Sequence, residues 1–248
     1  TLTGEGSLSV KGAYEEGIHT TGGLVIASGT LDVNAANTGI KGKDYVDITG
    51  GIVNVTAAQD GIKSTNTDDE SMGFTRLSAG SVTISAGDDG LKAPHTLEIS
   101  GGTLNIEKSN EGIEAQYINI LDGDVTVNSS DDGINASLKD SSSDTSSDTT
   151  SGTATTGQQT QQNQNGQVQQ APGGSQGSTG QNQNMPQPPT DGAMPGGGGG
   201  TFEVVDAAIN ISGGTVTVNA EGDGIDSNGT ATFSGGTVTV NGPTAGGN

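Results

Sequence analysis

Apolar and polar residues alternate in short stretches along the chain, and these stretches recur in groups of three. The clearest group occupies residues 97–115. Alternation with a period of two is typical of a strand that buries one face, so this group predicts three short strands separated by glycine-bearing turns. The apolar positions of the three strands are Leu97 and Ile99, then Leu104 and Ile106, then Ile113 and Ala115.

One phrase, an acidic or polar residue followed by glycine and an aliphatic residue, occurs seven times. Its glycines are 22, 22, 29, 22, 21 and 91 residues apart, so a period near 22 is interrupted by one small and one large insertion. Such a period indicates a solenoid, in which equivalent residues of successive coils stack. The sequence predicts an all-β parallel β-helix with about 22 residues and three strands per coil, in roughly seven to eight coils. The repeated glycines are Gly17, Gly39, Gly61, Gly90, Gly112, Gly133 and Gly224.

The two interruptions define the expected domain organisation. Residues 1–136 carry coils one to six, and residues 201–248 carry the final coils of the same domain. Residues 137–200 are rich in Ser, Gln, Asn, Gly and Pro, and we expect a disordered insertion there because almost no apolar side chains are present. Since two coils are too few to be stable alone, residues 201–248 should stack on the sixth coil. The smaller insertion is expected at residues 65–76.

The composition fits a thin, repetitive core and narrows the range of partners. Only 28% of the residues are hydrophobic and 2% aromatic, too few for an ordinary globular core in 248 residues. The formal net charge is −21 and all basic residues lie at or before Lys139, which argues against nucleic acid and favours cations. Cysteine is absent, and no run of about 18 apolar residues predicts a transmembrane segment. We expect an exported protein whose chain begins downstream of any targeting segment.

Residues directly before the repeated glycines are mostly acidic, and stacking would make them one column, here called the acidic column. Its members are Glu16, Thr38, Asp60, Asp89, Glu111, Asp132 and Asp223. The preceding positions form the outer column, which contains Glu15, Asn37, Gln59, Asp88, Asn110, Asp131 and Gly222. Like charges about 5 Å apart repel by a few kcal/mol at an effective dielectric constant near 20, so compensating positive charge is expected.

Two kinds of positive charge can offset this repulsion. The strand column, two residues after each glycine, contains His19, Lys41, Lys63, Lys92, Glu114, Asn135 and Asp226. Its lysines can serve the middle coils, and a metal ion is the stronger candidate where lysine is missing. Ligands that are all oxygen favour Ca²⁺. The predicted calcium ligands are Glu15, Glu16, Asp60, Asp88, Asp89, Glu111, Asp131, Asp132 and Asp223, with Asp68, Asp69 and Glu70 of the small insertion as a further candidate cluster.

A purely structural alternative explains part of the phrase. Acid–glycine pairs are common in turns, because the carboxylate bonds to nearby backbone and glycine accepts positive φ. This alternative accounts for each glycine. It accounts less well for the doubled acids at residues 15–16, 88–89 and 131–132.

No catalytic residue is predicted. A lyase acting on a uronate would need a strong base beside calcium, and the single arginine, Arg76, is expected in the small insertion rather than on a coil. Tyr14, Tyr45 and Tyr117 can stack on sugar rings, or they can cover the edges of coils.

The repeated phrases resemble those of a known family. The phrase Ile-Ser-Gly-Gly-Thr-Val-x-Val-x-Ala, complete at residues 211–220, is followed by Asp-Gly-Ile at 223–225. In this respect the chain is similar to a bacterial surface family of carbohydrate-binding β-helix proteins, which bind cellulose and acidic plant polysaccharide. The family has a pectate-lyase-like fold without established lyase activity. The resemblance covers residues 1–136 and 201–248.

The resemblance implies a right-handed helix, calcium, an extracellular location and polysaccharide binding. By position, it carries a metal-binding role onto Asp60, Asp88, Asp89, Glu111, Asp131, Asp132 and Asp223, whereas Thr38 departs from the acidic pattern. It carries over no sugar-contacting residue.

The expected function is non-catalytic, calcium-dependent binding of a polysaccharide at the bacterial cell surface. The glycan is expected to be acidic, such as polygalacturonate, or to be cellulose. Because the chain is strongly acidic, an acidic glycan would need cations that bridge carboxylate to carboxylate. We expect a monomer. The alternatives are a polysaccharide lyase and a passive surface stalk or adhesin.

Overall fold

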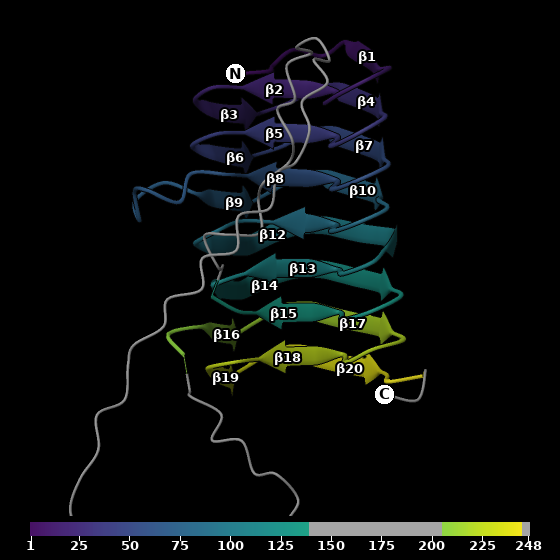
Figure 1. The fold of residues 1–248 in the computed structure, drawn as a ribbon. Helices are drawn as coiled ribbons and strands as arrows, with labels where there is room; N and C mark the ends of the chain where they lie inside the picture. Colours follow the sequence, from purple (N-terminus) through teal and green to yellow (C-terminus); the bar gives the residue numbers. More distant parts are fainter. Residues whose placement is uncertain (139–204, 245–248) are drawn as a thin grey trace, which may run out of the picture. The chain divides into compact units, whose positions relative to one another are not determined.

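The computed structural model describes residues 1–138 and 205–244, and these residues form strands and turns without any helix. Every pairing between the described strands is parallel. Successive passages of the chain lie one above another (Figure 1), and one such passage is called a coil below. The all-β, parallel architecture expected from the sequence is therefore confirmed. The described part of the chain has no helix with the length and apolarity of a membrane span.

The aliphatic residue after each repeated glycine begins a short strand, and these strands form a seven-stranded sheet. Its pairings align residues at the same position of the repeat, for example Ile40 with Ile62. In sequence order the strands are β2 (Ile18–Thr20), β5 (Ile40–Gly42), β8 (Ile62–Ser64), β11 (Leu91–Lys92), β13 (Ile113–Ala115), β15 (Ile134–Ala136) and β18 (Ile225–Ser227).

The other strands form a thirteen-stranded sheet with two rows of strands. One row contains β3 (Gly23–Ile26), β6 (Tyr45–Ile48), β9 (Phe74–Leu77), β16 (Ala208–Ile211) and β19 (Thr230–Phe233). The other contains β1 (Ser7–Gly12), β4 (Thr30–Ala35), β7 (Ile52–Ala57), β10 (Ser81–Ser85), β17 (Thr215–Ala220) and β20 (Thr237–Asn241). Two long strands, β12 (Thr96–Ser109) and β14 (Tyr117–Ser129), run through both rows and join them.

The long strands differ from the expectation of three separate strands per coil. The sequence predicts a turn at Gly101-Gly102, but β12 continues through it. Gly102 still has φ +81°, and the pairing of β12 with β14 shifts register between Ile99 and Thr103. The chain therefore bends at this corner through an irregularity of the ladder rather than by leaving the sheet.

The core is made of the alternate residues that the apolar pattern marks as inward-facing. Leu97, Ile99, Ile106 and Ile113 have no exposed surface. Pairing in register places aliphatic residues of adjacent coils in contact, as in the pair Val125 and Val216. Since a coil alone cannot cover its own apolar face, burial of these side chains depends on the coils above and below.

The repeated glycines are required by close packing and not by positive φ. None of the seven lies in the left-handed region. A Cβ on Gly39 would lie 2.2 Å from Val55 Cγ1 and 2.5 Å from the carbonyl oxygen of Gly61. The explanation that these glycines are needed for positive φ is therefore wrong. The absence of a side chain lets the turn approach both a core residue and the turn of the next coil.

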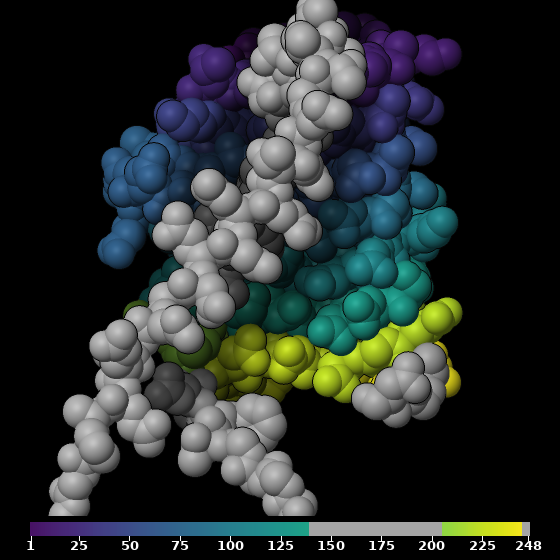
Figure 2. Space-filling view, viewed as in Figure 1, coloured from purple at the N-terminus to yellow at the C-terminus, as the bar shows by residue number. Residues whose placement is uncertain are grey.

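The small insertion is shorter than predicted, and this corrects the placement of Arg76. The loop between β8 and β9 comprises residues 65–73, and it projects beside the coils in Figure 1 and Figure 2. Arg76 lies in β9, paired with Asp47 of β6 and Glu98 of β12. The sequence misplaced it because Phe74–Leu77 contains only two inward residues, Thr75 and Leu77, and one of them is polar.

The last described strands pair directly with the coils that precede residue 139. β14 pairs with β16 and with β17, which aligns Ile118 with Ile209 and Val125 with Val216. β15 pairs with β18. All described residues belong to one compact unit. The predicted insertion at residues 137–200 lies, apart from residues 137 and 138, outside the described residues.

Candidate functional site

The turns that precede the seven-stranded sheet stack the acidic column in space. Each of the first six repeated glycines donates its backbone N–H to the carbonyl of the acidic-column residue in the next coil. The distances include 2.9 Å from Gly39 to Asp60, 2.8 Å from Gly61 to Asp89 and 2.9 Å from Gly90 to Glu111. The same bond continues from Gly133 to Asp223. Residues far apart in the sequence are thus held about one strand spacing apart, roughly 4.8 Å.

The outer column stacks in the same way. The backbone N–H of Asp88 donates to the carbonyl of Gln59 at 3.3 Å, and that of Asn110 donates to Asp88 at 2.8 Å. Asp131 donates to Asn110 at 3.0 Å. The two columns are therefore adjacent along one edge of the coils, as the period predicts.

Lysines of the strand column form ion pairs with the acidic column. Lys41 Nζ lies 3.1 Å from Glu16 Oε1, and Lys63 Nζ lies 2.7 Å from Asp60 Oδ2. Lys92 contacts both Asp89 Oδ2 and Glu114 Oε2, the latter at 2.9 Å. The expectation that lysine offsets the repulsion in the middle coils is confirmed.

Acidic side chains also converge closely enough to hold a metal ion. Among the described residues, two groups of three have carboxylate oxygens within 4.8 Å of one another. The first, here called the Asp88 cluster, contains Asp60, Asp88 and Asp89. The second contains Asp89, Glu111 and Glu114. Within the described part of the chain, the ammonium groups of Lys63 and Lys92 contact three of the five acids in these groups, Asp60, Asp89 and Glu114.

The Asp88 cluster fits a cation better than the second group does. Asp60 Oδ1 is buried and has no hydrogen-bond partner, although an unpaired buried oxygen is costly. Lysine contacts two of the three acids in each group, so the unpaired Asp60 Oδ1 is what distinguishes the first group. Thr38 stands in the acidic column beside the first group and donates its hydroxyl to Asp60 Oδ2 at 3.4 Å. Oxygen ligands alone suit a hard cation such as Ca²⁺.

Burial and mutual repulsion shift the pKa values in these groups. Burial raises the pKa of Asp89 to about 8, and the charges of Glu114 and Asp60 add to this effect against the attraction of Lys92. Burial acts in the same direction on Asp60, but Lys63 holds the pKa of Asp60 below its usual value. Burial alone would lower the pKa of Lys92, whereas Asp89 and Glu114 raise it overall, which keeps this lysine charged.

The raised pKa of Asp89 predicts that stability decreases with pH when divalent ions are chelated. A carboxyl group whose pKa is about 8 in the folded state and 3.8 ordinarily binds its proton more tightly when folded. Its stabilising contribution is complete below the ordinary value and is lost as pH rises through the folded value. We expect the melting temperature in EDTA to fall between pH 5 and pH 8.5, from the same pKa values, and Asp89→Asn to flatten that slope.

The control for this measurement is Asp124→Asn, which removes the same charge from an exposed position on β14. This control should keep the wild-type slope. An equal slope in Asp89→Asn and wild type would contradict the prediction.

The remaining predicted ligands are not part of either group. Glu16 is paired with Lys41, and Glu15 is exposed. Asp132 Oδ1 accepts the backbone N–H of Asp223 at 2.8 Å. Burial raises the pKa of Asp132, as do the charges of Asp131, Asp226 and Asp223. Metal binding by Glu15, Glu16, Asp131, Asp132 and Asp223 stays a prediction.

The loop acids serve local hydrogen bonds. Asp69 Oδ1 accepts the backbone N–H of Ser71 at 2.9 Å and its hydroxyl at 2.6 Å. Asn66 Oδ1 accepts the backbone N–H groups of Asp68 and Asp69. Glu70 is exposed. The structure does not bring Asp68, Asp69 and Glu70 together, and their role as a metal-binding cluster also stays a prediction.

Glu114 is the residue of the site that the sequence interpretation did not assign as a ligand. It belongs to the strand column, is 7% exposed and contacts Lys92. The signal was present in the sequence, because an acid replaces lysine at this position directly after Lys92 in the column. Such an acid–lysine neighbour predicts a cross-strand ion pair.

Arg76 is not placed to act as a base beside the acidic column. It lies in the thirteen-stranded sheet, whereas the acidic column borders the seven-stranded sheet. Its Nε lies 3.3 Å from Glu98 Oε1 and its Nη1 3.9 Å from Asp47 Oδ2. Both contacts are on the thirteen-stranded sheet, so Arg76 does not supply a base beside the two acidic groups.

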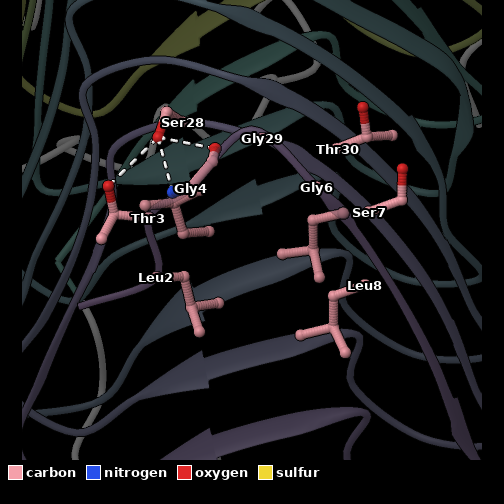
Figure 3. Close-up of a pocket in the computed structure, with 11 residues that line it drawn as sticks. Leu2, Thr3, Gly4, Gly6, Ser7, Leu8, Ser28, Gly29 and Thr30 are labelled. Carbon is pink, nitrogen blue, oxygen red and sulfur yellow. Dashed lines mark hydrogen bonds between the residues drawn. The ribbon is translucent and has the colours of Figure 1, made fainter.

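A cavity of about 220 Å³ at the first coil is unrelated to the acidic column. Figure 3 shows Ser28 Oγ at its wall, bonded to Thr3 Oγ1 at 3.1 Å and to the backbone of Gly4. Leu2, Leu8, Ile26 and Leu31, with glycines and small polar residues, complete the wall, and no charged side chain lines it. This cavity offers no carboxylate ligand for a cation.

Comparison with known proteins gives a family for this chain. A search of curated proteins and a search of solved structures each gave no match. Residues 1–161, more than half of the 248 residues, match a family described as carbohydrate-binding domain-containing protein. The match includes both acidic groups and all strands from β1 to β15. The chain belongs to this family of carbohydrate-binding domain-containing proteins.

Proposed function

We propose that this chain is a non-catalytic, calcium-dependent polysaccharide-binding protein of the bacterial cell surface, built as a right-handed parallel β-helix. The favoured ligand is an acidic glycan such as polygalacturonate. Membership of a carbohydrate-binding family supports binding of polysaccharide. Stacked parallel coils with a period near 22 residues support the β-helix.

The observation that carries the calcium proposal is the Asp88 cluster. Three carboxylates from two consecutive turns lie within 4.8 Å of one another, and the buried Asp60 Oδ1 lacks a hydrogen-bond partner. Asp88 is half-buried, so an ion held here would remain accessible from outside. Calcium takes six to eight oxygen ligands, roughly, and three side chains leave positions for water or for a ligand carboxylate.

Bridging by calcium would reconcile an acidic protein with an acidic glycan. The formal net charge of −21 repels polygalacturonate at long range. A divalent ion that binds Asp60, Asp88 and Asp89 on one side presents positive charge on the other. Salt would then weaken the long-range repulsion without replacing the ion.

The test is retention on immobilised polygalacturonate, measured in calcium and in excess EDTA. The calcium concentration is about 1 mM, on the order of that needed for extracellular calcium sites. Wild type should be retained only with calcium. Asp88→Asn should weaken retention at least about tenfold, the size of effect expected when one ligand of a metal site is lost. It should also remove the increase in melting temperature that calcium gives to the wild type.

Asp124→Asn is the matched control, because it removes one exposed carboxylate outside both acidic groups. It should behave as wild type. Equal retention of wild type with calcium and with EDTA would refute the bridging mechanism. Lack of retention in both conditions would favour a passive stalk.

A further inference from the structure

A second chemically distinctive surface lies on the outside of β6, β9 and β12. Parallel register places Tyr45 beside Phe74, and Asp47, Arg76 and Glu98 in one row. These residues point away from the core, because the residues that alternate with them along each strand are buried. All three strands lie within the segment that matches the carbohydrate-binding family.

The aromatic rings and the guanidinium form one ordered stack. The rings of Tyr45 and Phe74 are parallel, with centroids 4.8 Å apart and an interplanar angle of 1°. The guanidinium carbon of Arg76 lies 4.9 Å from the centroid of Phe74. Tyr45 in turn covers Gly23, where a Cβ would lie 2.1 Å from the ring. Phe74 therefore contacts the guanidinium while Tyr45 stacks on Phe74, and the stacked rings support Arg76 rather than offer a free platform for a sugar.

The guanidinium of Arg76 presents N–H donors between two carboxylates. Its side chain is 40% exposed, and Glu98 and Asp47 flank it at 3.3 and 3.9 Å. A guanidinium has five N–H donors and each carboxylate has about four acceptor positions, so capacity for hydrogen bonding remains on both. The row continues with two amides, since Asn119 pairs in register with Glu98 and Asn210 donates to Asn119 at 3.1 Å.

The charge of this row determines which ligand it suits. Two carboxylates around one guanidinium leave an excess of one negative charge, which disfavours a uronate carboxylate. Donors and acceptors that alternate at the strand spacing, about 4.8 Å, suit hydroxyl groups, which both donate and accept. We propose that the surface of Asp47, Arg76 and Glu98, with the guanidinium packed on Phe74, is a metal-independent contact site for an uncharged polysaccharide.

This inference extends the proposed function, because it rests on polysaccharide binding but not on calcium. The site would let the chain hold neutral regions of a glycan while the Asp88 cluster holds acidic regions. The two sites can be separated experimentally, because they use different residues and only one of them depends on calcium. The alternative is that the row only stabilises the sheet through cross-strand ion pairs.

The test is calorimetric titration of the full chain with cellohexaose, an uncharged β-linked glucan, in excess EDTA. Wild type should bind, and Arg76→Lys should bind at least about fivefold more weakly, because lysine keeps the charge but lacks the planar set of donors. Thr83→Ala, an outward position on β10, is the control and should bind as wild type does. The melting temperatures of Arg76→Lys and Thr83→Ala should lie close to that of wild type.

Each outcome bears on the proposal. No binding of cellohexaose by wild type in EDTA, or equal binding by Arg76→Lys and wild type, would overturn it. Asp88→Asn should leave cellohexaose binding unchanged and Arg76→Lys should leave calcium-dependent retention on polygalacturonate unchanged, so failure of one site is distinguishable from failure of the other. If Arg76→Lys instead loses polygalacturonate, the surface serves a charged glycan and the neutral class is refuted.

Discussion

Replacing Lys92 by methionine is expected to lower the free energy of unfolding by about 3–5 kcal/mol, the cost typical of breaking a buried ion pair by removing one partner. Lys92 contacts Asp89 and Glu114, whose side chains are 2% and 9% exposed. Methionine fills similar volume, so the loss comes from charge and not from a cavity. Urea unfolding at pH 8 in EDTA measures the change.

Two variants make this measurement decisive. Lys11→Met, at an exposed position on β1, should change the free energy of unfolding by less than about 0.5 kcal/mol, as surface substitutions usually do. The double variant Lys92→Met/Glu114→Gln should recover part of the loss, since it also removes the charge of one of the two acids that Lys92 contacts. A loss below about 1 kcal/mol for Lys92→Met would place the pair among weak surface ion pairs and contradict the prediction.

Protons and calcium should each substitute in part for the missing lysine. Burial has raised the pKa of Asp89 to about 8, so Lys92→Met should lose less stability at pH 5, where that carboxyl group is protonated. Calcium should stabilise the variant for the same electrostatic reason. Lysine, proton and metal are therefore three responses to one feature, the stacking of acids on consecutive turns.

The stacking itself could be predicted from the sequence because a fixed period determines register. Once the glycines recur at about 22 residues, the parallel ladder must align Ile18, Ile40 and Ile62, and the residues before and after them follow. The residues of the core could also be predicted. Alternation identified Leu97 and Ile99 as inward-facing, and both are fully buried.

Side-chain reach and strand continuity could not be predicted in the same way. The sequence identified the columns, but it did not show that Lys92 bridges two coils or that Glu114 completes a second acidic group. Arg76 was misplaced because β9 carries a polar inward residue, Thr75, whose hydroxyl donates to the carbonyl of Lys92 at 3.0 Å. The hydrogen bond that satisfies this polar residue joins two different strands, so the apolar pattern along one strand does not predict it.

The repeated glycines provide the second large expected effect. Gly112→Ala should destabilise the fold by about 1–3 kcal/mol or more, as overpacking of a well-packed core does. The new Cβ would lie 2.2 Å from Val127 Cγ1 and 2.3 Å from the carbonyl oxygen of Gly133. The carbonyl oxygen belongs to the backbone and cannot move away by a change of side-chain rotamer, so the turn itself must shift. Urea unfolding measures the loss.

Gly6→Ala is the control for this substitution, because a Cβ there meets nothing within 4 Å, and it should leave stability unchanged or slightly increased. Equal stability of Gly112→Ala and Gly6→Ala would refute the packing explanation for the repeated phrase. The substitution also reaches the site, since Gly112 separates Glu111 from the strand that carries Glu114. A displaced turn should therefore weaken electrostatic coupling across the acidic column even in molecules that remain folded.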